Sequence, residues 1–242
     1  MNPNTSQEEA KGNPVEIFQN AWNMYRKIVE HDYMFHTSIY GDLGRYLEGL
    51  QEAAPLAVVE LGCGDASQSM KAFKRCRLAS YLGLDLSQPA LELAARNLAS
   101  LPCPVRLELA DMLEGLSLVD TPVDVIFSGF ALHHLALEDK ARFFALTRNA
   151  LKPGGVLLLT DVMREPGQSR EDYLSAYLGY AEQHWQSLVP AEFTLLREHV
   201  GNFDYPETAE TYERMARESG FASARQLSRH TWHQTWIYRD GD

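Results

Sequence analysis

The stretch that decides the fold covers residues 58–67 and reads Val58-Val59-Glu60-Leu61-Gly62-Cys63-Gly64-Asp65-Ala66-Ser67. An apolar run ends at an acidic residue, and a pair of glycines then opens a predicted helix. Glycine allows a sharp turn with positive φ and lets a ligand approach the backbone closely. The start of a helix adds N–H groups that have no partner within the helix. Together these features predict a loop that holds a nucleotide cofactor.

Short apolar segments alternate with helical patterns on both sides of this loop. The segments predicted as strands are Leu56–Leu61, Ser80–Leu84, Val105–Leu109, Val123–Ser128 and Val156–Thr160. The helical patterns between them lie near Ser67–Arg75, Gln88–Ser100 and Leu137–Leu151. Strands this short and apolar are typical of a parallel sheet that is buried on both faces. The alternation therefore predicts an α/β fold, with a doubly wound, mostly parallel sheet.

The flanking segments follow other patterns. Helical spacing is expected over residues 15–30, from Asp42 to Leu50, and over Arg170–Leu188, Ala191–Val200 and Pro206–Gly220; two last strands are expected near Ala222–Arg229 and His230–Tyr238. We therefore expect a disordered tail over residues 1–14 and a single domain over residues 15–242. Its parts are a helical cap segment (15–55), a cofactor-binding core (56–161), a helical lid insertion (162–205), and a last helix with the terminal strand pair (206–242).

Composition narrows the possible partners. The chain has 242 residues and a formal net charge of −11, which argues against nucleic acid because phosphate binding needs a concentrated basic surface. No apolar stretch approaches the ~20 residues that span a bilayer. Residues 1–13 carry no hydrophobic signal core, so we expect a cytoplasmic protein without membrane contact. The three cysteines are too scattered for a disulfide framework or a spaced metal site.

The spacing after the loop separates two classes of cofactor. Asp85 ends the second predicted strand, 23 positions beyond Gly62, where a carboxylate can accept bonds from ribose hydroxyls. A dinucleotide fingerprint needs a third glycine at position 67, which is Ser67. Glu60 would also meet a pyrophosphate with an unfavourable negative charge. An acid there suits a cationic ligand with an amino acid portion, such as S-adenosylmethionine.

The chain at this point resembles the class I S-adenosylmethionine-dependent methyltransferases. The resemblance rests on the loop Glu60–Gly64, on Asp85, and on the segments Ala110–Met112, Asp124–Leu135 and Leu151–Gly155, in that order. It implies seven strands, the last of them antiparallel. One departure is Ala66, where the family often has a third glycine; we expect it only to narrow the loop.

The resemblance also implies a set of site residues. Those expected to hold S-adenosylmethionine are Glu60, Gly62, Cys63, Gly64, Asp85, Leu86, Asp111, Met112 and Ser128. Asp85 would bind the ribose, although it could instead cap the next helix. Asp111 would meet the adenine, although it could be an ordinary turn acid.

The acceptor side of the site is less marked in the sequence. The candidate pocket residues are Phe35, Tyr40, His133 and Tyr177. His133 is a candidate general base, or else a wall of the pocket with a structural role. Adjacent His133 and His134 make a poor chelating pair, so no metal is expected. Tyr177 lies on an aromatic helix that either packs on the domain or forms a lid.

These features favour methyl transfer from S-adenosylmethionine to a small molecule, by in-line displacement at the sulfonium methyl. The methylated atom, whether N, O or C, and the oligomeric state are left open by the sequence. Two alternatives stay open. One is an enzyme that remodels the cofactor itself, like the carboxy-S-adenosylmethionine synthases. The other is a non-catalytic subunit that binds the cofactor.

Overall fold

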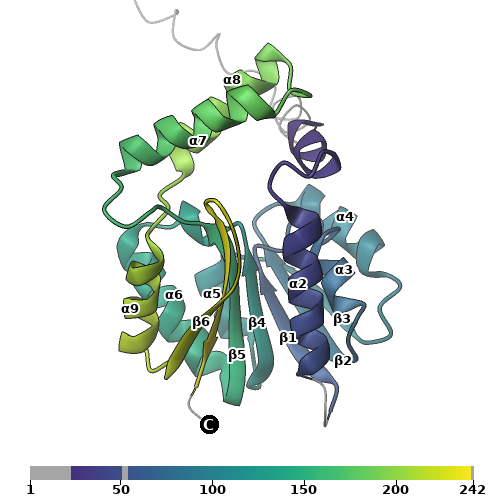
Figure 1. The fold of residues 1–242 in the computed structure, drawn as a ribbon. Helices are drawn as coiled ribbons and strands as arrows, with labels where there is room; N and C mark the ends of the chain where they lie inside the picture. Colours follow the sequence, from purple (N-terminus) through teal and green to yellow (C-terminus); the bar gives the residue numbers. More distant parts are fainter. Residues whose placement is uncertain (1–22, 51–53, 241–242) are drawn as a thin grey trace, which may run out of the picture. The chain divides into compact units, whose positions relative to one another are not determined.

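A computed structural model of the chain describes residues 23–50 and 54–240. The predicted tail at 1–14 and the first part of the helix predicted over 15–30 lie outside these residues. The described strands form one sheet in the order β3-β2-β1-β4-β5-β7-β6 (Figure 1). They are β1 (Leu56–Leu61), β2 (Leu78–Asp85), β3 (Val105–Leu109), β4 (Val123–Gly129), β5 (Leu151–Val162), β6 (Ser223–His230) and β7 (His233–Arg239).

The pairing confirms the predicted fold class. β1 is parallel to β2 and β4, β2 to β3, and β4 to β5, whereas β7 is antiparallel to β5 and to β6. Because the central strands run the same way, their carboxyl ends meet at one edge of the sheet. The loop after β1 lies at that edge.

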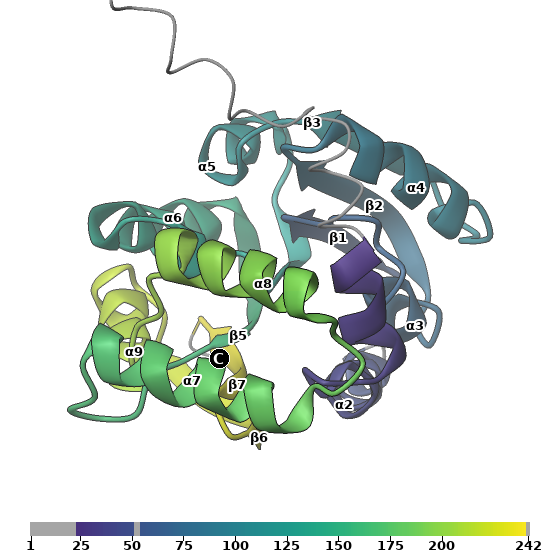
Figure 2. The ribbon, with the colours of Figure 1, turned by 90° about the horizontal axis from the view of Figure 1, so that it is seen from above.

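Helices cover both faces of this sheet (Figure 2). Residue 23 to residue 30 are helical, and the helices that follow are α2 (His36–Gly49), α3 (Ser69–Phe73), α4 (Gln88–Leu98), α5 (Met112–Gly115), α6 (Leu137–Ala150), α7 (Arg170–His184), α8 (Pro190–Phe203) and α9 (Ala209–Glu218). Alternate residues of a strand point to opposite faces. Accordingly Val58 packs in the core with α2, α3 and α4, and Val59 packs in the core with α5, α6 and α9.

The contacts divide the chain into two compact units. The larger contains residues 35–173 and 205–240, and therefore the whole sheet. The smaller contains the described residues 23–34 together with 174–204. Inside the smaller unit the Trp185 ring stacks on Tyr33, and Lys27 pairs with Glu192 at 2.7 Å. The single domain expected over residues 15–242 stays a prediction.

Several element boundaries differ from those predicted, and three of the differences concern the site or its surroundings. α2 begins at His36 instead of Asp42, because the left-handed Phe35 starts the helix without a capping side chain. α3 is only five residues long and begins at Ser69, after a turn in which Ala66 has a φ of +52°. β5 starts at Leu151 instead of Val156, and its pairing with β4 is irregular in this first part. No helix among the described residues is long and apolar enough to cross a bilayer.

Phe144 provides a test of how the sheet is closed. Its buried ring contacts the rings of Phe143, Tyr212, Phe221 and Tyr238, which joins α6 to α9 and β7. We expect Phe144→Ala to lower the free energy of unfolding by about 3–5 kcal/mol, measured by urea denaturation. Phe203→Ala is the matched control, since Phe203 is 57% exposed and its truncation should cost less than about 0.5 kcal/mol. Equal losses in the two variants would contradict this account of the core.

Candidate active site

The loop after β1 is held against the end of β2 by backbone hydrogen bonds. The N–H groups of Gly62 and Cys63 both donate to the Leu84 carbonyl at 2.9 Å. The Gly64 N–H donates to the Asp85 carboxylate at 2.8 Å. The loop is therefore a closed turn whose shape is fixed by the neighbouring strand.

The two glycines of the loop have different surroundings. Both have positive φ, +68° for Gly62 and +53° for Gly64. A Cβ atom at Gly62 would lie 2.6 Å from the Ala131 Cβ, so this glycine allows the loops after β1 and β4 to touch. A Cβ atom at Gly64 would meet nothing within 4 Å. The backbone at Gly64 is thus where a ligand can come close to the loop.

Ala66 adopts the conformation that glycine favours. Its φ of +52° lies in the left-handed region, and its side chain is buried. This conformation costs an alanine about 1–2 kcal/mol relative to the right-handed one. The expectation that the missing glycine only narrows the loop was therefore incomplete, because the backbone keeps the turn and the alanine is strained.

Glu60 lies beneath the loop in the core. It is 3% exposed, and its carboxyl accepts a hydrogen bond from the Tyr81 hydroxyl at 2.5 Å. Burial raises the pKa of Glu60 to about 8, although hydrogen bonds from Tyr81 and Ser69 oppose the rise. Burial also raises the pKa of the Cys63 thiol, which stays protonated. Contact of either side chain with a ligand stays a prediction.

The Asp85 carboxylate joins the loop to the next helix. One oxygen accepts from the Gly64 N–H, and the other accepts from the Ser87 N–H at 2.8 Å. The cap of α4 is Ser87 itself, whose hydroxyl accepts from the Ala90 N–H. A carboxylate can accept about four hydrogen bonds, so Asp85 keeps capacity for two ribose hydroxyls. Leu86, next to it, is 73% exposed.

The other predicted cofactor residues lie at the same edge of the sheet. Asp111 caps α5, with one oxygen accepting from the N–H groups of Leu113 and Glu114. The Met112 methyl lies 4.0 Å from where a Gly62 Cβ would be, which brings the β3 loop to the β1 loop. The Ser128 hydroxyl is fully buried in β4. The adenine contact of Asp111 stays a prediction.

Phe35 and Tyr40 lie near the end of β4, at the same edge. The Tyr40 hydroxyl is 3.1 Å from where a Gly129 Cβ would be. The Phe35 ring stacks on the His230 ring and contacts the His233 ring edge-on, with 5.7 Å between the Phe35 and His233 centroids. Burial lowers the pKa of His233 to about 3, so its ring is neutral. Phe35, Tyr40 and His233 together form an aromatic, uncharged wall, and its place in a substrate pocket stays a prediction.

Tyr177 belongs to the smaller unit. Its ring is buried and contacts Trp185 edge-on at 5.9 Å between centroids. Burial raises the pKa of its hydroxyl. Its place in a substrate pocket and the lid role of residues 162–205 stay predictions.

His133 lies in a short 3-10 helix (Leu132–His134) after β4, and Asp161 of β5 holds it at two points. The Asp161 carboxylate lies 2.5 Å from the ring nitrogen Nδ1 and accepts from the His133 N–H at 2.9 Å. The Tyr205 N–H donates to the His133 carbonyl at 2.8 Å. The histidine is therefore fixed through both its ring and its backbone.

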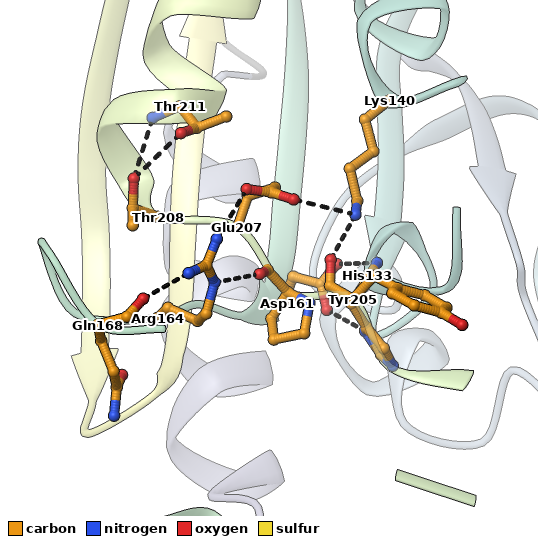
Figure 3. A network of polar contacts seen from close by, with 10 residues as sticks. His133, Lys140, Asp161, Arg164, Gln168, Tyr205, Glu207, Thr208 and Thr211 are labelled. Carbon is orange, nitrogen blue, oxygen red and sulfur yellow. Dashed lines mark hydrogen bonds and ion pairs between the residues drawn. The ribbon is translucent and has the colours of Figure 1, made fainter. Parts of the chain in front are cut away.

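A second set of contacts supports this arrangement (Figure 3). The buried Lys140 ammonium donates to the Tyr205 carbonyl and lies 3.7 Å from the Glu207 carboxylate. Arg164 pairs with Glu207 at 3.1 Å and donates to the Pro206 carbonyl. Burial lowers the pKa of Lys140, and the nearby Glu207 opposes that shift. The network ties α6 and β5 to the segment before α9.

Comparison with known proteins agrees with this geometry. Residues 58–155 match the family model described as a methyltransferase domain. The match covers the loop, the end of β2, and the strands and loops as far as β5. The core of the chain belongs to the class I S-adenosylmethionine-dependent methyltransferases. Its fold is the S-adenosylmethionine-binding fold of that family.

The methyltransferase core is similar to several curated proteins. It is 35% identical over 112 residues to a malonyl-[acyl-carrier protein] O-methyltransferase of Xylella fastidiosa, which covers 46% of this chain and 37% of that protein. It is 30% identical to phosphoethanolamine N-methyltransferase 3 of Arabidopsis thaliana, over 48% of this chain and 23% of the other. A carboxy-S-adenosyl-L-methionine synthase of Pseudomonas putida is 26% identical over 69% of each chain. The chain therefore spans well under half the length of the first and second of these relatives.

Solved structures show the same fold. The magnesium protoporphyrin IX methyltransferase of Synechocystis, with bound S-adenosylhomocysteine, superposes with a TM-score of 0.61 at 15% identity. The superposition covers 91% of this chain and 94% of the other. At that identity the likeness concerns the fold.

Several residues around the candidate site could not be identified from the sequence. Two residues from separate parts of the chain, Asp161 and Tyr205, are bonded to His133. A third, Lys140, is bonded to the Tyr205 carbonyl. Asp161 carries one local signal, because it is an acid directly after an apolar predicted strand. His233 is brought to this edge of the sheet because β7 pairs with β5, where His233 lies opposite Val162.

Glu60 gives the methyltransferase core a testable pH dependence. In the folded state the carboxyl keeps its proton to about pH 8, whereas its ordinary pKa is 4.5. The stability that protonated Glu60 contributes is therefore complete below about pH 4.5 and is lost as the pH rises to about 8, at up to about 1.4 kcal/mol per pH unit. We expect Glu60→Gln to remove this slope from urea unfolding curves measured between pH 5 and 8.

A second variant checks the cause of that slope. Tyr81→Phe removes a hydrogen bond that lowers the pKa of Glu60. The pH range over which the free energy of unfolding falls should therefore extend to higher pH. A slope in the Glu60→Gln protein equal to that of the wild type would show that another group is responsible.

Proposed function

We propose that this protein transfers a methyl group from S-adenosylmethionine to a small organic acceptor. The observation that carries the proposal is the Asp85 carboxylate bonded to the Gly64 N–H, in a loop whose backbone is open to a ligand at Gly64. This arrangement offers a turn for the methionine portion and a carboxylate for the ribose. The family membership of the core and the N-methylation named for the Arabidopsis relative support the same chemistry.

The residues present fit the cofactor. Asp85 retains acceptor capacity for hydroxyl groups, and exposed Leu86 offers an apolar surface for a base. Asp111 has one oxygen outside its capping bonds. Bound S-adenosylmethionine would supply an activated methyl group on a sulfonium. The protein's own part is to hold the acceptor in line with that methyl and to exclude water.

The acceptor class follows from the site and from the charge of the chain. The wall of Phe35, Tyr40 and His233 is aromatic and uncharged, which suits an organic molecule rather than a phosphate backbone. His133 is the candidate base for an acceptor that loses its proton during transfer. The net charge of −11 also disfavours nucleic acid.

Modification of the cofactor itself is a second candidate function. The Pseudomonas carboxy-S-adenosyl-L-methionine synthase matches 69% of both chains, more of each than the two methyltransferase relatives do. Mass spectrometry of the ligand that copurifies with the protein separates the two functions. A carboxylated cofactor would favour the second candidate.

The ribose assignment predicts a loss of affinity. We expect Asp85→Ala to raise the dissociation constant of S-adenosylmethionine about 10- to 100-fold in calorimetry, because hydrogen bonds to a charged group contribute about 1.5–3 kcal/mol. Asp124→Ala is the matched control. Asp124 likewise accepts a backbone N–H, from Ala57, but at the amino end of β4. A folded Asp85→Ala protein with wild-type affinity would refute the assignment.

The methyl-transfer proposal is tested directly by product identification. The protein is incubated with methyl-labelled S-adenosylmethionine and a metabolite extract, and labelled products are identified by mass spectrometry. We expect a labelled small molecule, formed about 10²- to 10⁴-fold more slowly by His133→Ala if the histidine is the base. Cofactor affinity should not change in that variant. Wild-type turnover would leave His133 as a wall residue, and no labelled product in any fraction would contradict methyl transfer.

A further inference from the structure

We propose that Arg225, Arg239 and Tyr46 form a binding site for a small organic phosphate, apart from the cofactor loop. The site is a surface depression of about 490 Å³ between α2 and the β6–β7 hairpin. Pockets for small molecules usually measure about 300–1,000 Å³, so this one is large enough for a phosphate with an organic group attached. The site is additional to the proposed methyl transfer, and its test needs no methyl acceptor.

The register of the β6–β7 hairpin places both arginines on the face that packs against α2. Arg225 lies opposite Ile237, and Ser223 lies opposite Arg239. Residues opposite each other on paired strands, and residues two apart on one strand, share a face of the sheet. Ile237 is buried in the core together with Leu43 of α2. The side chains of Ser223, Arg225 and Arg239 are therefore on the α2 side of the sheet.

Tyr46 brings the two guanidinium groups together. The Cζ atoms of Arg225 and Arg239 each lie 5.8 Å from the centre of the Tyr46 ring. The Arg239 Nε–H donates to the Tyr46 hydroxyl oxygen at 3.0 Å. Burial raises the pKa of Tyr46, although the two arginines oppose the rise, so the hydroxyl keeps its hydrogen at neutral pH. Because an arginine can only donate, the bond from Arg239 does not use that hydrogen, which can be donated to a ligand.

The two positive charges have no acid beside them. Among residues 23–50 and 54–240, no carboxylate lies within ion-pair distance of Arg225 or Arg239. By contrast Arg229, further along β6, pairs with Glu165. Acids are not scarce in this chain, which has 33 Asp and Glu against 22 Lys and Arg. Two like charges held close together raise the free energy of the folded chain, and a bound anion would lower it.

The lining of the site suits an anion with two negative charges. The polar side chains in it are those of Tyr46, Ser223, Arg225 and Arg239. Each of them can donate a hydrogen bond, and the lining contains no carboxylate or amide side chain. Guanidinium groups bind phosphate through two parallel N–H···O bonds. A phosphate ester carries a charge of about −1.5 to −2 at pH 7, which balances two arginines, whereas a carboxylate balances one. Ala224 and Ile237 complete the lining with an apolar surface for the organic group.

The site lies at the edge of the sheet opposite to the cofactor loop. Arg239 pairs with Val156, where the regular pairing of β5 begins, and Tyr46 is in the last turn of α2. The bond between Gly64 and Asp85 lies instead at the carboxyl ends of the strands. Binding of S-adenosylmethionine and binding of a phosphate can therefore be measured separately, and cofactor affinity serves as a check that a variant is folded.

Phenyl phosphate is the probe, titrated into the ¹⁵N-labelled full chain while the arginine Nε–H resonances are followed by NMR. We expect the resonances of Arg225 and Arg239 to shift together. Arg225→Gln or Arg239→Gln should raise the dissociation constant about 10- to 100-fold, because each removes charge-assisted hydrogen bonds. Tyr46→Phe keeps the ring and should raise it about 2- to 10-fold. The two arginine variants also assign the resonances.

Arg229→Gln is the matched control, because it removes the same charge from the same strand but takes an arginine that already has a partner. At about 0.15 M salt, which screens more distant charges, its affinity for phenyl phosphate should stay within about twofold of wild type. All four variants should keep the wild-type affinity for S-adenosylmethionine. Arg225 is exposed, so its variant tests the site even if Arg239→Gln loosens α2.

The absence of any shift of the two arginine resonances at about 10 mM phenyl phosphate would overturn the proposal, and so would an equal loss of affinity in Arg229→Gln. Benzoate tests the charge of the ligand, and inorganic phosphate tests the apolar surface. Equal affinity for benzoate would overturn the assignment to a phosphate. Inorganic phosphate bound as tightly as phenyl phosphate would overturn the assignment to an organic one. None of these results depends on whether a methyl acceptor is found.

Discussion

The hydrogen bond from the Gly64 N–H to the Asp85 carboxylate organises the cofactor side of this protein. It exists because β1 and β2 are parallel, so that the loop leaving one strand meets the last residue of the other. The same carboxylate receives the Ser87 N–H at the start of α4. One strand end therefore shapes the loop and directs the next helix. Glu60 supports the loop from below as a buried carboxyl bonded to Tyr81.

A similar arrangement occurs at strands β4 and β5. Asp161 is the next-to-last residue of β5 and Asp85 is the last residue of β2, and each carboxylate receives a backbone N–H from the loop that follows the neighbouring strand. The two acids differ in their second bond. Asp85 turns to the helix after its own strand, whereas Asp161 binds an imidazole. The same arrangement, a strand-end acid bonded to the loop after the neighbouring strand, therefore occurs twice at this edge of the sheet.

The sequence was informative where partners are close in the chain or where a motif repeats a known spacing. β3 has the predicted bounds, α4 begins at Gln88 as predicted, and Asp85 is bonded to the glycine loop. The support of His133 was not predictable, because Asp161 and Tyr205 reach it only after the sheet has formed. Lys140 looks like a solvent-facing lysine of a surface helix, and its contacts with the Tyr205 carbonyl and the Glu207 carboxylate explain its burial. The early start of α2 depends on a left-handed phenylalanine, which no local rule favours.

The place of β7 between β5 and β6 has a consequence for synthesis on the ribosome. Strands β1 to β5 and the cofactor loop emerge first, and β7 follows only at residues 233–239. Until then the outer edge of β5 presents a row of unpaired backbone groups, which is a template for pairing with another nascent chain. The β6–β7 hairpin therefore protects the sheet from self-association as well as completing it, and its late arrival defines the interval in which a chaperone would be needed most.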